Sequence, residues 1–169
     1  MSERVIKLMN TIIRKLIYQS ILAITLFSAA FSVTASNIDV YKSPACKCCA
    51  KWVDHLRTNG FIVNIKDIGN KEARKHAGIS SALGSCHTAI VDGYAIEGHV
   101  PAQDIKRFIN NPPSNAIGLA VPGMPMGSPG MEGSHSDPYN VLLIDKKGDA
   151  SVYSRHIPSD QRESVLKLK

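Results

Sequence analysis

Apolar and polar residues along the middle of the chain follow short-range patterns that predict alternating strands and helices. Ile38–Tyr41 alternates like a strand rich in β-branched and aromatic side chains. From Cys49 to Leu56 the apolar positions recur at helical spacing, and Asn59-Gly60 supplies a helix stop signal. Phe61–Ile65 then predicts a second strand. The folded part of the chain is therefore expected to begin with a strand, a helix and a strand.

The pattern continues with a short helix, a β-hairpin and a third helix. Asp92-Gly93 is a strong hairpin signal, and Pro101 suits the first turn of a helix. These segments are Lys71–His76 for the short helix, Thr88–Val91 with Tyr94–Glu97 for the hairpin, and residues 101–109 for the third helix. A C-terminal hairpin is expected from Tyr139–Ile144 and Ser151–His156, and the apolar run in its first strand predicts a strand buried on both faces.

The order strand, helix, strand, helix, hairpin, helix resembles that of the thioredoxin fold. Cys46 and Cys49 form a Cys-x-x-Cys at the head of the first helix, where thioredoxins carry their dithiol. Thioredoxins also have a proline in the loop entering the strand after the second helix, facing that dithiol. Here the loop has no proline and holds Cys86. The resemblance implies an α/β, thioredoxin-like sandwich with a mixed central sheet, in which Cys86 points back at Cys46, Cys48 and Cys49.

Composition changes after the third helix. Gly118–Asp137 is rich in glycine and proline and is expected to sustain neither helix nor strand. It contains Met124, Met126 and Met131, whose thioethers suit monovalent copper. Two interpretations stay open: a Gly/Pro/Met-rich loop that supplies metal ligands or covers a site, and a plain solvated loop.

The N-terminus predicts an export signal over residues 1–35. Four basic residues, Arg4, Lys7, Arg14 and Lys15, precede the apolar run Ile17–Ala30, and Val33-Thr34-Ala35 offers small residues at cleavage positions. The run is short for a membrane span, although an uncleaved anchor stays an alternative. Cleavage leaves residues 36–169 as one domain, without stable membrane association. It also removes four basic residues and one acidic residue, so the net charge falls from +6 to +3.

Several classes of function are disfavoured by what the chain lacks. It has no basic patch interleaved with aromatic residues, so nucleic acid is not an expected partner. It shows no internal repeat, no serine-histidine-aspartate order and no glycine motif that would cradle a phosphate.

The candidate chemistry is concentrated in the thiols at the start of the first helix. Backbone N–H groups and the helix dipole favour thiolates at that position. Two thiols, Cys46 and Cys49, suggest dithiol redox catalysis, and the third, Cys48, suggests a soft metal as well. Cu(I) accepts two or three thiolates and allows bridging, so the four cysteines could hold more than one ion. Zinc bound by four cysteines is the alternative metal.

The histidines differ in their expected roles. His87 adjoins Cys86 and is expected to ligate a metal or to orient the site through a hydrogen bond. His99 lies near a strand end, at the same end of the sheet as the cysteines, and is a further candidate ligand. His55 and His76 lie on predicted helices and are expected at the surface.

Five stretches together resemble the small exported CopG-like copper-resistance proteins. They are Cys46–Trp52, Ser85–Ala89, Glu97–Ala102, Gly118–Pro125 and Gly127–Glu132. The resemblance covers nearly all of the chain after the export signal. It implies a thioredoxin-like domain that binds copper through its cysteines and handles copper in the Gram-negative periplasm, with other copper-handling proteins there as candidate partners.

Three hypotheses on function follow. The first is a copper protein that sequesters Cu(I), with cycling between Cu(I) and Cu(II) left open. The second is a thiol–disulfide oxidoreductase that uses Cys46 and Cys49. The third is a carrier that delivers copper without catalysis. The two extra cysteines and the methionines favour copper over disulfide exchange alone, which needs only two thiols.

Overall fold

A computed structural model describes residues 3–27, 36–159 and 161 of the chain. The chain divides into two compact units, Met1–Thr34 and Ala35–Lys169. The first contains the helix α1 (Glu3–Phe27). No helix within the described residues is both long enough and apolar enough to cross a membrane. The expected cleavage positions, 33–35, and the end of the apolar run, 28–30, lie outside the described residues.

The second unit is built on one mixed sheet of seven strands, in the order β2-β1-β3-β4-β5-β6-β7. The β1–β2 and β4–β5 pairs are parallel and the other four are antiparallel. The strands are β1 (Asn37–Lys42), β2 (Ile62–Lys66), β3 (His87–Val91), β4 (Tyr94–Glu97), β5 (Ala116–Ala120), β6 (Tyr139–Asp145) and β7 (Ala150–His156). The structure confirms the α/β class, the mixed central sheet and both hairpins; the thioredoxin-like assignment stays a prediction.

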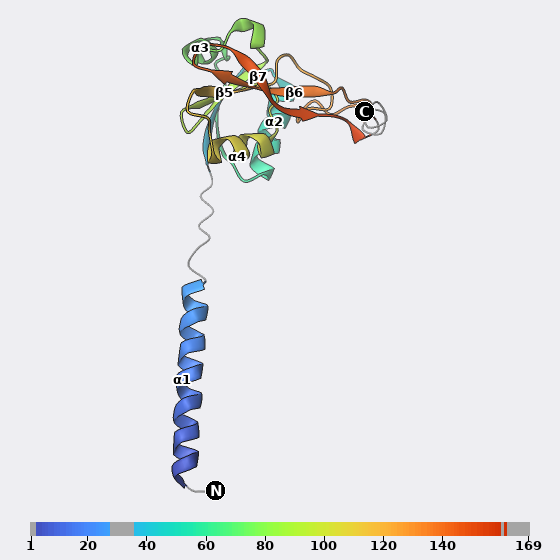
Figure 1. The fold of residues 1–169 in the computed structure, drawn as a ribbon. Helices are drawn as coiled ribbons and strands as arrows, with labels where there is room; N and C mark the ends of the chain where they lie inside the picture. Colours follow the sequence, from blue (N-terminus) through green and yellow to red (C-terminus); the bar gives the residue numbers. More distant parts are fainter. Residues whose placement is uncertain (1–2, 28–35, 160, 162–169) are drawn as a thin grey trace, which may run out of the picture. The chain divides into compact units, whose positions relative to one another are not determined.

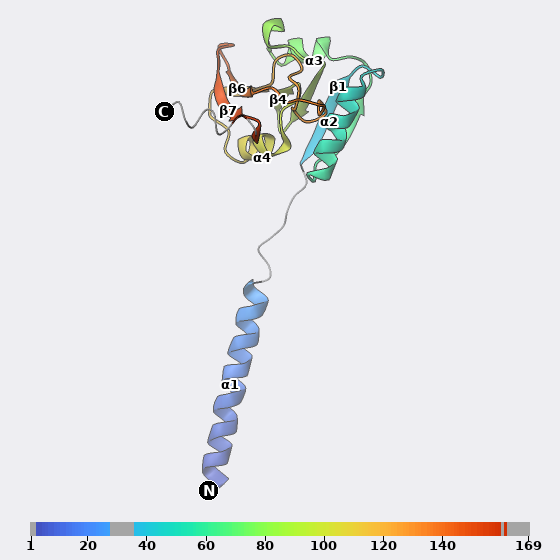
Figure 2. The same ribbon diagram turned by 90° about the vertical axis from the view of Figure 1, so that its right-hand side faces the viewer.

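Helices cover the two faces of the sheet unequally. The main core joins strand residues to α2 (Lys47–Thr58) and α4 (Ala102–Asn110). The other face packs a smaller cluster beside α3 (Lys71–His76) and the 3-10 turn η1 (Ser81–Leu83). Figure 1 shows α3 above the sheet and α2 and α4 below it, and Figure 2 shows the same helices after a quarter turn. The chemistry at the head of α2 therefore lies on the more deeply packed side.

The helix α2 forms because one of its faces is apolar. Cys49, Trp52, Val53 and Leu56 recur at helical spacing, and all four are buried. The helix ends before Gly60, whose φ of +85° suits a residue without a Cβ. Burial of this face holds the first turn of α2 against the sheet.

The strand β5 corrects the prediction that Gly118–Asp137 sustains neither helix nor strand. Gly118, Leu119 and Ala120 lie in β5, between β4 and β6. Gly118 pairs with Ala95, and a Cβ at Gly118 would overlap the Ala95 carbonyl oxygen. Glycine is therefore required by the close approach of two strands, and it does not mark a loop here.

The C-terminal hairpin extends the sheet as predicted, but its first strand is less buried than expected. Val141 and Ile144 are buried, whereas Leu142 and Leu143 are half-buried. β6 lies one strand from the edge of the sheet, and Leu143 is only partly buried against the main core. The connection from β5 to β6, residues 121–138, contains the expected Gly/Pro/Met-rich loop.

Candidate metal centre

The first cysteine of the site, Cys46, caps the N-terminus of α2. Its sulfur accepts a hydrogen bond from the Cys49 backbone N–H at 3.3 Å, in the position that serine or threonine usually fills. Cys46 and Cys49 form a disulfide with their Cα atoms 5.3 Å apart. Cys49 is fully buried, while Cys46 and Cys48 are half-buried. The structure thus describes the oxidised form of the Cys-x-x-Cys, with the outer sulfur more exposed than the inner one.

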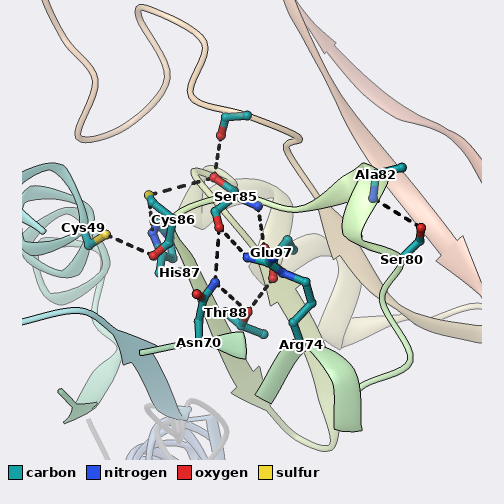
Figure 3. Close-up of polar contacts among 11 residues, drawn as sticks. Cys49, Asn70, Arg74, Ser80, Ala82, Ser85, Cys86, His87, Thr88 and Glu97 are labelled. Carbon is teal, nitrogen blue, oxygen red and sulfur yellow. Dashed lines mark hydrogen bonds and ion pairs between the residues drawn. The ribbon is translucent and has the colours of Figure 1, made fainter. Parts of the chain in front are cut away.

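Cys86 lies directly before β3 and reaches the cysteines of α2. The Cys48 sulfur is 3.5 Å from the Cys46 sulfur and 3.9 Å from the Cys86 sulfur. Cys49 approaches the same loop, with its sulfur 3.6 Å from the Cys86 carbonyl oxygen (Figure 3). The sulfurs of Cys46, Cys48, Cys49 and Cys86 all lie within 4.8 Å of one another. Four cysteine sulfurs from two distant segments, two of them joined in the disulfide, are therefore gathered in one place.

Two imidazoles adjoin the Cys86 sulfur. His99 Nε2 lies 3.1 Å from it and His87 Nδ1 lies 3.3 Å from it. The other ring nitrogen of His99, Nδ1, is 2.8 Å from the Pro129 carbonyl oxygen. Because a carbonyl oxygen only accepts, Nδ1 carries the hydrogen, and the Nε2 lone pair faces the sulfur. This is the tautomer in which Nε2 can serve as a metal ligand.

The His87 ring is enclosed by other rings. Its centroid lies 4.2 Å from that of Trp52 and 4.9 Å from that of His99. Trp52 is itself fixed, because its Nε1–H donates to the Val100 carbonyl oxygen at 2.9 Å. The His87 Nε2 atom is buried without a hydrogen-bond partner among the described residues. A buried imidazole nitrogen with no partner is costly, and a ligand would satisfy it.

Burial sets the charge of these groups. It lowers the pKa of His87 to about 3, and the neighbouring His99 contributes to this shift. Burial also lowers the pKa of His99, and it raises the pKa of the Cys86 thiol, with the nearby Cys48 adding to the effect. Both imidazoles are therefore neutral near pH 7. The Cys86 thiol keeps its proton until something replaces it, as a soft metal does.

The backbone of the Gly/Pro/Met-rich loop also reaches the site. Pro129 accepts from His99, and a Cβ at Gly130 would lie 2.7 Å from the Cys48 carbonyl oxygen. Met124 is 52% exposed, and Met126 and Met131 are half-buried. Among the described residues, no hydrogen bond joins their sulfurs to the cysteine cluster. The loop contacts the site through its main chain, and a ligand role for its methionines stays a prediction.

Three features of the site were not predicted from the sequence: the partial burial of His55, a backbone contact with His99, and a hydrogen-bond network around Glu97. His55, expected at the surface, is half-buried, and its Nε2 accepts from the Ala102 N–H at 3.0 Å. The Pro129 carbonyl contact with His99 has no sequence signal, because it is made by the backbone. A network centred on Glu97 holds the loop that carries Cys86; the only signal for it is a carboxylate placed at the end of an apolar strand.

Comparisons with known proteins agree with this picture. Residues 83–131 match a family described as "Protein of unknown function, DUF411". Two solved structures titled "Copper resistance protein copG", Form 1 and Form 2, are each 40% identical to this chain, with a TM-score of 0.68. The match covers 74% of this chain for Form 1 and 73% for Form 2, and 100% of each of those chains. No match was found among curated proteins.

The thiol state of the metal-free protein is the first testable consequence. We expect alkylation under non-reducing conditions to label two cysteines, Cys48 and Cys86, and peptide mapping to recover Cys46 linked to Cys49. The measurement is intact mass before and after alkylation, with a reduced sample as the control that labels all four. Four labelled thiols in the unreduced protein would contradict the arrangement.

Proposed function

Because the chain belongs to the CopG family of copper-resistance proteins, we propose that it holds Cu(I) in a site built from its four cysteines, with His87 and His99 beside them. The observation that carries the proposal is the approach of the Cys86 sulfur to Cys48, at 3.9 Å, and to His99 Nε2, at 3.1 Å. Copper is the cargo or substrate of this site.

The donor set suits monovalent copper. Thiolate sulfur is a soft donor and selects Cu(I) over harder cations, and imidazole also binds copper. Neutral His87 and His99 need not lose a proton to bind, and their Nδ1 and Nε2 atoms lie 3.3 Å and 3.1 Å from the Cys86 sulfur. Two overlapping groups share Cys86: one with the three cysteines of α2, the other with the two histidines. Two groups with a common sulfur support the proposal that more than one ion binds, because a thiolate can bridge.

All four cysteines can act as metal donors only when the disulfide is reduced. A disulfide sulfur is not a thiolate, so the Cys46–Cys49 bond must be reduced before all four cysteines can ligate. Reduction takes two electrons and yields two thiolates. Two Cu(I) ions that become two Cu(II) ions release two electrons, so electron exchange between copper and this disulfide is balanced. Cycling of copper between oxidation states is therefore part of the proposal.

The second candidate function is a thiol–disulfide oxidoreductase that uses Cys46 and Cys49. The observation in its favour is the disulfide itself, with half-buried Cys46 open to attack and Cys49 fully buried behind it. Thiol counting after anaerobic addition of Cu(I) to the disulfide form distinguishes the possibilities. Four thiols indicate electron exchange with copper, and two indicate storage or delivery. Reduction of insulin by the copper-free protein would support the second candidate.

The proposal places the mature protein in the periplasm, with residues 1–35 as its signal peptide. The basic and apolar pattern of the N-terminus supports export. In that compartment the free thiols of Cys48 and Cys86 would otherwise be oxidised. A metal bound to them protects them.

Substitution of Cys86 tests the four-thiol site. Cys86→Ser should lower the affinity for Cu(I) or the number of ions bound while leaving the circular dichroism unchanged, because it replaces one small polar residue by another. The double variant with Cys46→Ser should lose less than the sum of the two single losses, since residues that share a metal are coupled. Competition with a Cu(I) chelator measures all three. Wild-type affinity in Cys86→Ser would refute the site and favour the oxidoreductase.

Leucine substitution tests the methionines of the loop. Replacing Met124, Met126 and Met131 by leucine keeps the apolar volume and removes the soft donors. If the thioethers ligate, Cu(I) dissociates faster from the triple variant, while the melting temperature of the metal-free protein changes little. Stopped-flow transfer to a chelator gives the rate. Identical rates for the triple variant and wild type would assign the loop a covering role only.

The mass of the exported protein tests the location. Cells that express the full chain should release from the periplasm a protein that begins near Ser36. Intact-mass measurement of the osmotic-shock fraction identifies it, and metal analysis of the same fraction from copper-supplemented cells should find copper. A full-length species that stays with the inner membrane would instead identify residues 1–35 as an uncleaved anchor.

A further inference from the structure

Glu97 is a fully buried carboxylate outside the set of candidate ligands. It is the last residue of β4 and has no exposed surface. Its Oε1 accepts from the Ser85 backbone N–H at 2.6 Å and from Arg74 Nε at 2.8 Å. Its Oε2 accepts from the Thr88 hydroxyl at 2.5 Å. Figure 3 shows these contacts beside Cys86. Both carboxylate oxygens are therefore engaged, and the charge is paired with Arg74.

The peptide groups on either side of Ser85 are held together by this network. Glu97 accepts a hydrogen bond from the Ser85 N–H. The Ser85 carbonyl oxygen accepts from Arg74 Nη2 at 2.5 Å and from Asn70 Nδ2 at 3.2 Å. Arg74 thus binds both the carboxylate and the carbonyl, as the fork of a guanidinium allows. Cys86 is the next residue. The main chain that carries its sulfur is fixed before any metal is considered.

The segment that follows the end of β4 also contributes a histidine that faces the Cys86 sulfur. Two residues after Glu97, His99 faces the Cys86 sulfur at 3.1 Å. Between them Gly98 has a φ of +72°, and a Cβ there would collide with Ser85 and with the Val121 carbonyl oxygen. The segment 97–99 therefore holds the Cys86 loop with one residue and presents a candidate ligand with another.

We propose that Glu97 is a positioning residue that, through the Ser85 peptide, holds the Cys86 sulfur against Cys48 and His99. Among the described residues, its hydrogen bonds go to Arg74, Ser85 and Thr88, and none goes to a cysteine sulfur or an imidazole. Its effect on the site is therefore indirect. The role of this positioning in copper binding rests on the proposed function, but the position of Cys86 in the metal-free protein does not.

The first test needs no copper. In the disulfide form only Cys48 and Cys86 are free, so the rate of alkylation of Cys86 is measured against Cys48 in the same molecule by peptide mass spectrometry. Glu97→Ala should raise this ratio about tenfold, because a released loop exposes a thiol that is now shielded. Glu97→Gln should change it much less, since the amide oxygen can still accept from Ser85. The control is Glu72→Gln, an equal change of charge on the exposed face of α3.

Arg74→Lys provides an independent variant if Glu97→Ala fails to fold. Lysine keeps the positive charge but cannot bind the Glu97 carboxylate and the Ser85 carbonyl with one planar fork. It should therefore raise the alkylation ratio in a protein with unchanged circular dichroism. A wild-type ratio in Arg74→Lys, or in a folded Glu97→Ala, would overturn the proposal.

The second test uses Cu(I) and a double-mutant cycle. Glu97→Ala should weaken Cu(I) binding in the otherwise wild-type chain and have no further effect in a Cys86→Ser background, because the residue acts through that sulfur. Equal losses in the two backgrounds would show a general structural role and overturn the proposal. If the wild-type protein binds no Cu(I), the proposed function fails, and the alkylation ratio still decides whether Glu97 positions Cys86.

Discussion

The antiparallel pairing of β1 with β3 is the constraint on which the site depends. Its register places Lys42, the last residue of β1, opposite His87, the first residue of β3. The chain leaves β1 toward α2 at the same edge of the sheet at which it enters β3. Cys86, directly before β3, must therefore lie near the first turn of α2. Cysteines that are 38 residues apart in sequence meet with their sulfurs 3.9 Å apart because two strands pair.

Packing around that meeting point favours a neutral, soft site. Trp52 and the loop at Pro129 enclose the imidazoles, and burial keeps both histidines uncharged. The same burial raises the pKa of Cys86, so the metal-free site avoids an unpaired thiolate. Under the proposed function, a Cu(I) ion would replace the thiol proton of Cys86 and supply the positive charge that stabilises a thiolate. Burial thus disfavours an unpaired Cys86 thiolate in the metal-free site and favours a thiolate that is paired with a soft cation.

Local patterns predicted the elements, and a fold analogy predicted the position of Cys86. The face formed by Cys49, Trp52 and Leu56 is readable because helical periodicity is a local property. Spacing alone could not join Cys86 to α2, since strand pairing is long-range. The strand β5 was missed because Gly118 looks like a loop residue, whereas it allows the main chain to pass close to Ala95.

The buried Glu97–Arg74 pair shows why part of a site escapes sequence reasoning. Breaking such a pair costs about 3–5 kcal/mol, yet replacing both partners by apolar residues of similar volume is often neutral or stabilising. Stability alone is therefore a weak reason for a carboxylate with no exposed surface at the end of β4. An apolar pair would fill the same space but could not hold the Ser85 N–H and carbonyl oxygen. What the charged pair adds is direction: its hydrogen bonds fix the peptide groups on either side of Ser85, the residue next to Cys86.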